Sequence, residues 1–256
     1  MIDAVSRAPL KFLKEKLTNI LTGVWPAITT RMGLSRGAFA PFFKAVKKRG
    51  FYPATVIDVG VAKGTAGLYT AFSRAHFVMV EPIVEFEPAL KRLAQRYDAE
   101  YILAAASDTT GTAIMRIFGG LTSSTLMPGA IEGLSSSDPR LRTIETITLD
   151  SLLDRCAIVP PLLVKLDIQG TELRALDGAA ELLRITDMLV LETSLYRFHG
   201  PAMPDFYDVV SYMKARGFVV YDVLGGFPRK LDGALGQVDL VFVQEDGRFR
   251  TSHAWE

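Results

Sequence analysis

Two stretches near the start of the chain combine turn-forming glycines with carboxylates. The apolar run 56–59 contains Asp58 and breaks into a small-residue turn at Gly60 and Gly64, and a later apolar run, 78–80, ends in Glu81. In nucleotide-binding βαβ units such a turn lets the backbone approach the ligand, and an acid at the tip of the second strand accepts hydrogen bonds from ribose hydroxyls. We therefore predict a site for an adenosine-type ligand, with Glu81 on its ribose.

The spacing of the glycines, at positions 60, 64 and 67, fits neither the G-x-G-x-x-G fingerprint nor its common short-chain variant. That fingerprint holds a pyrophosphate against a helix N-terminus. Both segments are instead similar to the first two motifs of class I methyltransferases, which bind S-adenosylmethionine. The matching residues are Asp58, Gly60, Gly64, Glu81 and Pro82. The resemblance implies that Asp58 and the turn face the methionine part; a plain tight turn between strand and helix is the alternative interpretation.

Polar side chains also end other apolar runs. Lys165 and Asp167 share one side of the run 162–167, and Glu192 closes the run 188–193. Because burying charges without partners or function is costly, this pattern favours a site. Lys165 and Asp167 could instead pair with each other or cap the following helix. The turn 107–108, which follows the run 101–105, would border the adenine.

From residue 54 the chain alternates strand-like and helix-like patterns. This alternation predicts an α/β fold with a largely parallel sheet and helices on both faces, whose ligands lie outside the carboxyl ends of the strands. The last two strands, joined by the loop 225–236, are expected to pair antiparallel. The expected strands are 55–60, 77–81, 101–105, 162–167, 188–193, 218–224 and 237–244, and the expected helices are 64–74, 85–97, 171–184 and 204–216.

Between the third and fourth of these strands, the segment 108–150 follows a different pattern. Extended segments are expected at 112–118 and 143–149, and Asp150 is expected to cap a helix that follows it.

Residues 8–50 are expected to be helical, with amphipathic stretches at 10–21 and 39–48. Binding to a membrane surface is one interpretation of the first stretch; a lid or packing helix, at a dimer contact for example, is the other. We expect a helical extension over residues 1–50 and a ligand-binding domain over 51–248.

Composition bounds the remaining possibilities. The formal charge of +1 gives no reason to expect a nucleic-acid partner. Cys156 is the only cysteine, so the chain can form no intrachain disulfide, and a reducing, cytoplasmic location is expected. No apolar run is long enough to span a bilayer, and the N-terminus lacks the pattern of a signal peptide.

Taken together, the motifs resemble the FkbM family of S-adenosylmethionine-dependent O-methyltransferases over roughly residues 40–245. The resemblance depends on Ile57-Asp58-Val59-Gly60 with Gly64, Val80-Glu81-Pro82, Ala106-Ser107-Asp108 with Gly111, Ser123-Ser124, Thr148-Leu149-Asp150, Lys165-Leu166-Asp167-Ile168 with Gly170 and Glu172, and Glu192. It implies a class I methyltransferase (Rossmann-like) fold with a mostly parallel seven-stranded sheet. The chain departs from the family at 61–63, where Ala-Asn is usual, and at Gln169, where an acid is usual.

The resemblance also implies site residues. Those expected to contact S-adenosylmethionine are Asp58, Gly60, Ala62, Gly64, Glu81, Ser107, Asp108 and Asp167. Methyl transfer to a hydroxyl requires alignment and removal of the hydroxyl proton. The candidate bases are Asp167, Glu192 and His199, and Lys165 is expected to orient Asp167 or to acidify the acceptor. The family's acceptors are hydroxyls of sugars, glycolipids, glycans and macrolides, and we expect a carbohydrate hydroxyl.

Three other functions are alternatives to this interpretation. Asp167 and Glu192 could hold Mg²⁺ for a diol acceptor, but the sequence offers no third ligand, so we expect no metal. A short-chain oxidoreductase needs a tyrosine followed four residues later by lysine, and none of the eight tyrosines has one. A non-catalytic scaffold that keeps the cofactor fold and binds a partner through its N-terminal helices stays open.

Overall fold

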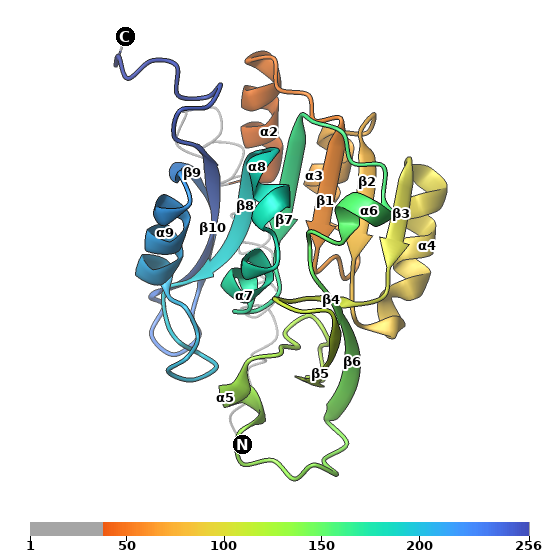
Figure 1. Cartoon of the computed structure of the whole chain (residues 1–256). Helices are drawn as coiled ribbons and strands as arrows, with labels where there is room; N and C mark the ends of the chain where they lie inside the picture. The colour runs from red at the N-terminus through yellow and green to blue at the C-terminus, as the bar shows by residue number, and fades with distance from the viewer. Residues whose placement is uncertain (1–37, 256) are drawn as a thin grey trace, which may run out of the picture.

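A computed structural model describes residues 38–255 of the chain. Its main sheet has seven strands in the order β3-β2-β1-β7-β8-β10-β9, in which only β10 runs antiparallel to its neighbours (Figure 1). The strands are β1 (Thr55–Val59), β2 (His76–Val80), β3 (Ala99–Ile102), β7 (Leu162–Leu166), β8 (Thr186–Ser194), β9 (Phe218–Pro228) and β10 (Leu235–Gln244). The predicted mostly parallel sheet, with its antiparallel last pair, is confirmed.

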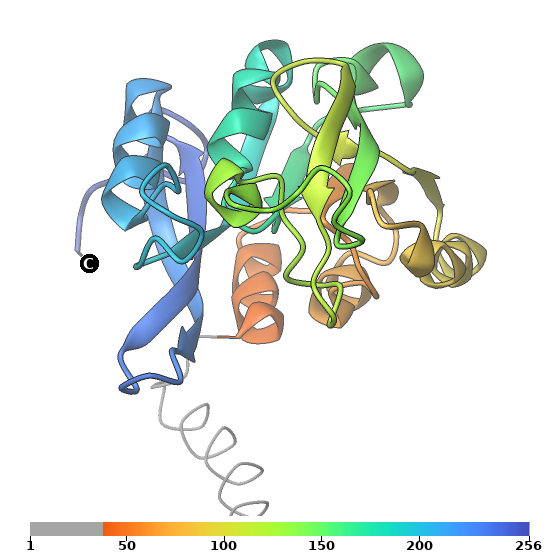
Figure 2. The same cartoon turned by 90° about the horizontal axis from the view of Figure 1, so that it is seen from below.

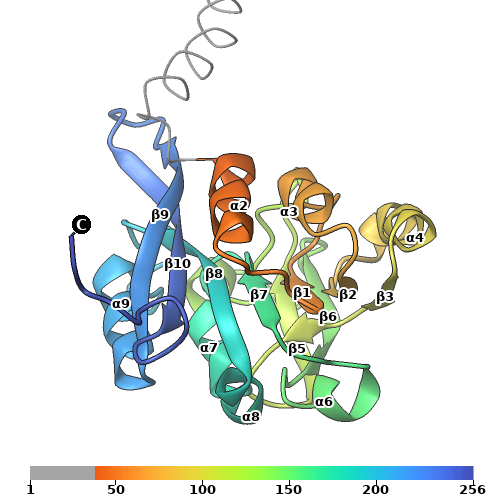
Figure 3. The same ribbon diagram turned by 90° about the horizontal axis from the view of Figure 1, so that it is seen from above.

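Helices cover both faces of this sheet (Figure 3). One face carries α2 (Phe39–Lys48), α3 (Ala66–Ala71) and α4 (Glu87–Arg96), and the other carries α6 (Leu152–Arg155), α7 (Glu172–Asp177), α8 (Ala180–Arg184) and α9 (Phe206–Ala215). Successive strand residues serve opposite faces: Val56 is buried with the α2–α4 layer, and Ile57 with the α7–α9 layer. The central strands are therefore apolar on both sides, as expected for a parallel sheet.

Two local predictions were wrong. The helix expected over 171–184 is two helices, because the carbonyl of Gly178 accepts the N–H of Asp150 (2.9 Å) and so leaves the helical ladder. A Cβ at Gly178 would lie 2.4 Å from the carbonyl oxygen of Ser107, so the break depends on a close backbone approach. Asp150 does not cap α6, whose N-cap is Ser151; its carboxylate accepts the N–H of Leu182 (2.8 Å) in α8.

A second, three-stranded sheet lies at the carboxyl ends of the main strands (Figures 1 and 2). It consists of β4 (Ala105–Ala106), β5 (Gly111–Arg116) and β6 (Leu141–Ile147). The short helix α5 (Pro128–Ile131) lies between β5 and β6 in the chain. Met115 and Ile144 of this sheet pack against Ile83 and Phe86, which belong to the segment around the 3-10 helix η1 (Val84–Phe86). The inserted segment 108–150 therefore covers the edge at which ligands of such sheets bind.

Helix α2 has the bounds that the sequence predicted, and its residues Phe42, Phe43 and Val46 are buried on the sheet. The amphipathic stretch 10–21 lies outside the described residues, and the domain boundary at residue 50 stays a prediction. Within residues 38–255, no helix is both long and apolar enough to cross a bilayer.

A histidine at the amino end of β2 makes folding stability depend on pH. His76 contacts the carboxylates of Asp98 (3.1 Å) and Glu100 (3.0 Å). Partial burial lowers the pKa of His76, but the hydrogen bonds from Glu100 and Asp98 outweigh it, so the pKa is raised. The stabilisation is therefore fully present below the ordinary pKa of ~6.5 and is lost as the pH rises through the raised pKa.

Between pH 6 and pH 9 we expect the free energy of unfolding of the wild type to fall by up to ~1 kcal/mol relative to that of His76→Gln. The effect is small because both acids are partly exposed to solvent. Urea unfolding of both proteins at each pH measures this difference. A constant difference across the range would contradict it.

Candidate active site

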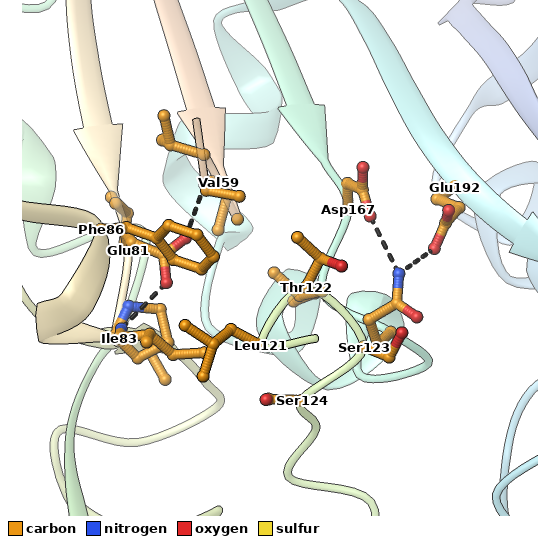
Figure 4. Close-up of a pocket in the computed structure, with 18 of the residues that line it drawn as sticks. Val59, Glu81, Ile83, Phe86, Leu121, Thr122, Ser123, Ser124, Asp167 and Glu192 are labelled. Atoms are coloured by element: carbon orange, nitrogen blue, oxygen red, sulfur yellow. Dashed lines mark hydrogen bonds between the residues drawn. The ribbon is translucent and has the colours of Figure 1, made fainter. Parts of the chain in front are cut away.

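A cavity of about 690 Å³ lies between the carboxyl ends of β1, β2, β7 and β8 and the second sheet (Figure 4). Its walls come from the turn 60–65, from 81–83 with Phe86, from the loop 120–124, and from 167–169 with Thr171. Glu192, Phe227 and Gln237 line its other end. The position is the one that the strand–helix alternation predicts for a ligand.

Glu81 defines one end of the cavity. Its buried carboxylate accepts the backbone N–H groups of Ala62 (2.8 Å) and Ile83 (2.9 Å), one on each oxygen. Each oxygen keeps a lone pair for another donor, such as one hydroxyl of a ribose diol. Apolar groups beside it, Ile83, Phe86, Ala105, Ala106 and Met115, also line the cavity and suit a flat aromatic base. This end therefore fits an adenosine moiety.

Backbone hydrogen bonds around Gly60 connect the carboxyl ends of β1, β2 and β7. Gly60 donates to the carbonyl of Val80 (2.9 Å), and the N–H of Asp167 donates to the carbonyl of Val59 (3.0 Å). Gly60 has φ +78°, and a Cβ there would lie 2.0 Å from the carbonyl oxygen of Asp167. Only glycine fits this position, so the ends of β1, β2 and β7 can meet at the cavity wall.

Behind this wall lies a buried charge network. The Lys165 ammonium is 3.1 Å from Asp167 Oδ2 and 3.9 Å from Asp58 Oδ1, and Tyr69 donates to Asp58 Oδ2 (2.9 Å). Burial opposes the charge of Lys165, but the carboxyls of Asp167, Asp58 and Asp239 outweigh it and raise its pKa. Lys165 and Asp167 thus form the ion pair that the sequence left open, and Asp167 also faces the cavity.

Asp58 lies outside the cavity lining. It is fully buried, and its Oδ1 has no hydrogen-bond partner among residues 38–255. Its contact with the methionine part stays a prediction.

Asp167 and Glu192 form the other end of the cavity, reaching toward one side chain between them (Figure 4). That side chain is Gln169, whose Nε2 lies 3.1 Å from Asp167 Oδ1 and 2.6 Å from Glu192 Oε2. Burial, reinforced by the charge of Asp167, raises the pKa of Glu192 to about 9. Burial therefore favours the protonated form of Glu192.

Three residues other than glycine have positive φ among those described: Ala62 (48°), Leu121 (61°) and Gln169 (58°). All three line the cavity. Because such backbone conformations are costly and tend to gather at functional sites, they mark this cavity independently of its side chains.

Five of the expected site residues lie outside the cavity lining: Asp58 and Lys165 belong to the buried network behind it, and Ser107, Asp108 and His199 lie elsewhere. Ser107 donates to Asp108 (2.9 Å), which is paired with Arg174 (2.8 Å) on the surface. The half-buried ring of His199 packs on Phe118 with centroids 5.9 Å apart, and burial, followed by the charge of Arg116, lowers its pKa. The structure therefore brings Asp167 and Glu192 together but leaves His199 apart from them.

Sequence reasoning missed Gln169, the tip of the loop 120–124, Phe227 and Gln237. The motif Ser123-Ser124 signalled the loop, but no role was attached to it. Among residues 38–255, no three His, Cys, Asp or Glu side chains are grouped so that they could hold a metal ion.

Solved structures of low sequence identity resemble the chain. One is a Burkholderia thailandensis 1,6-didemethyltoxoflavin-N1-methyltransferase with bound 1,6-didemethyltoxoflavin and S-adenosylhomocysteine (14% identity, 95% of this chain and 93% of that chain covered, TM-score 0.38). Another is the Methanococcus jannaschii fibrillarin pre-rRNA processing protein (12% identity, 76% and 67% covered, TM-score 0.44). Comparison with curated proteins gives no significant match.

The comparison with family models is decisive. The methyltransferase FkbM domain matches residues 58–220, well over half of the chain. The match includes the turn after β1, Glu81, the second sheet, Asp167 and Glu192. The chain therefore belongs to the FkbM methyltransferase family and is an S-adenosylmethionine-dependent methyltransferase.

Proposed function

We propose that this enzyme methylates a hydroxyl group of a sugar, glycolipid or polyketide-type acceptor. The observation that carries the proposal is the polarity of the cavity, which has an adenosine-fitting end at Glu81 and a second end lined by hydrogen-bonding side chains. S-adenosylmethionine supplies an activated methyl group when bound. Its ribose and adenine fit Glu81 and the apolar wall, and the turn 60–64 is left for its methionine part.

The second end of the cavity suits an acceptor with several hydroxyl groups. Asp167, Glu192, Gln237 and Ser123 offer acceptors and donors, and Phe227 adds an apolar ring at the mouth, where it is 62% exposed. Carboxylates and amides recognise hydroxyls through hydrogen bonds, while an aromatic ring packs on the C–H face of a sugar or on an apolar chain.

Asp167 is the residue we assign to take the proton of the acceptor hydroxyl. Lys165 and Gln169 each hold one of its oxygens, which fixes the carboxylate toward the cavity. Glu192, whose raised pKa favours its protonated form, donates a hydrogen bond to the acceptor and orients it. In this proposal Lys165 is a positioning residue, and His199 takes no part in the transfer.

Replacing Asp167 by asparagine tests these roles. A positioned general base contributes ~10²–10⁴-fold to the rate, so we expect kcat to fall by about that factor while the Kd of S-adenosylmethionine changes little. Release of S-adenosylhomocysteine and the mass gain of the acceptor measure the reaction. His199→Ala is the matched control and should stay near the wild-type rate. Wild-type turnover in Asp167→Asn, or its loss in His199→Ala, would reverse the assignment.

The acceptor class is tested with a panel of sugar nucleotides, glycolipids, macrolides, catechols and amines. Methylation of a sugar or macrolide hydroxyl, unaffected by chelator, supports the proposal; methylation restricted to catechols with Mg²⁺, or to nitrogen, contradicts it.

A cytoplasmic location and a homodimer are part of the same proposal, supported by the single cysteine and by the amphipathic pattern at 10–21. Cell fractionation and sedimentation test them.

A further inference from the structure

Two carboxyl groups share the polar wall of the cavity and contact the same glutamine amide. Asp167 directly follows β7, and Glu192 lies near the carboxyl end of the neighbouring parallel strand β8. The Nε2 of Gln169 lies between them, 3.1 Å from Asp167 Oδ1 and 2.6 Å from Glu192 Oε2. Lys165 reaches Asp167 only from behind, at its other oxygen. The amide of one neutral side chain therefore contacts both acids.

Two carboxylates that face each other in a poorly solvated wall repel, and proteins relieve this with a proton, a cation or a hydrogen-bond donor. The primary amide of glutamine carries two N–H hydrogens on one nitrogen, one for each acid. An acid at the same position would bring a third set of oxygens instead. Clustered carboxylate oxygens are the ligands that Mg²⁺ and Mn²⁺ prefer.

The backbone around Gln169 is built to hold its side chain there. The φ of +58° turns the residue out of the strand direction, an uncommon conformation without glycine. Its carbonyl oxygen accepts the hydroxyl of Thr125 (2.8 Å), and that hydroxyl in turn accepts the N–H of Met127 (3.1 Å). Thr125 is fully buried, so the backbone that carries the Gln169 side chain is held by the protein rather than by solvent.

We propose that Gln169 is a positioning residue whose amide takes the place of a divalent cation between Asp167 and Glu192. It holds the two acids as one pair and keeps the site independent of metal. Its role in turnover depends on the proposed function, but its role in excluding a cation does not. An experiment can therefore contradict the proposed function without contradicting the role of Gln169 in excluding a cation, and the reverse.

Gln169→Glu tests the proposal directly. We expect this variant to bind Mn²⁺ with a Kd at least tenfold tighter than that of the wild type, measured by calorimetry and by the Mn²⁺ EPR signal without any acceptor. The double variant Gln169→Glu/Glu192→Gln is the matched control, because it returns an amide beside two carboxylates and should lose the added affinity. Binding of S-adenosylmethionine to each variant checks that the fold is kept.

A second variant, Gln169→Leu, keeps the proposal testable if the extra acid prevents folding. Without the amide the pair loses a hydrogen bond that favours its ionised form, so the pH of half-maximal kcat should rise by about one unit or more, with the KM for S-adenosylmethionine unchanged. Three results would overturn the proposal: equal Mn²⁺ binding by wild type and Gln169→Glu, equal binding by the double variant and Gln169→Glu, or an unchanged pH profile in Gln169→Leu. If Mn²⁺ binds to the variants as expected but no acceptor is methylated, only the proposed function is contradicted.

Discussion

Replacing Glu81 by alanine is expected to weaken S-adenosylmethionine binding by at least ~100-fold. Hydrogen bonds from ribose hydroxyls to a charged group contribute ~1.5–3 kcal/mol each, and tenfold in affinity corresponds to ~1.4 kcal/mol. The variant also leaves the N–H groups of Ala62 and Ile83 without their acceptor, so the turn loses its anchor. Calorimetric titration with S-adenosylmethionine and S-adenosylhomocysteine measures the effect.

Glu85→Ala is the matched control for this experiment. Glu85 lies four residues further on, but its carboxylate is partly exposed and pairs with Arg142 (2.7 Å) on the surface. Its loss should leave cofactor affinity within about twofold, because exposed ion pairs contribute little. Equal affinities of Glu81→Ala and the wild type would mean that the ribose lies elsewhere.

Replacing Gly60 by alanine is expected to lower the free energy of unfolding by at least ~3 kcal/mol, in the upper range for single substitutions. The added Cβ would lie 2.0 Å from the backbone oxygen of Asp167, and no side-chain rotation can relieve a clash with backbone. The ends of β1 and β7 would have to separate. Any folded fraction should also lose activity, because Asp167 would move with its carbonyl.

Gly217→Ala separates this clash from ordinary backbone strain. Gly217 has almost the same φ, +80° against +78° for Gly60, but no atom lies within 4 Å of the Cβ position. Its substitution should cost only ~1–2 kcal/mol, the strain of a left-handed residue. Urea unfolding curves give both values, and similar losses in the two variants would show that the clash is relieved by a small shift.

The fold was predictable because its signals are local. Apolar runs, glycine turns and basic helix ends specify β1, β2, β7 and α2 within a few residues, and strand–helix alternation then leaves few topologies. Glu81, Asp167 and Glu192 follow from the same logic, since a polar residue that ends a buried strand must lie at the ligand edge.

The rest of the site could not be predicted because it depends on contacts between distant segments. Gln169 lies two residues after Asp167, where the family usually has an acid, but the sequence shows neither its positive φ nor the bond from Thr125 to its carbonyl. His199 follows β8 closely, yet its carbonyl lies against Gly129 and its ring packs on Phe118. Position along the chain places a residue at an edge, but not in the cavity.

One hydrogen bond connects the loop 120–124, which lines the cavity, to the wall that carries Asp167 and Glu192. Thr125, the residue after this loop, donates its hydroxyl to the carbonyl of Gln169 (2.8 Å). An acceptor that lifts the loop therefore pulls on the backbone that carries the amide between Asp167 and Glu192. Bulky and slender acceptors would then differ in rate as well as in affinity, because the contact of a substrate with the loop 120–124 would affect the rate of methyl transfer.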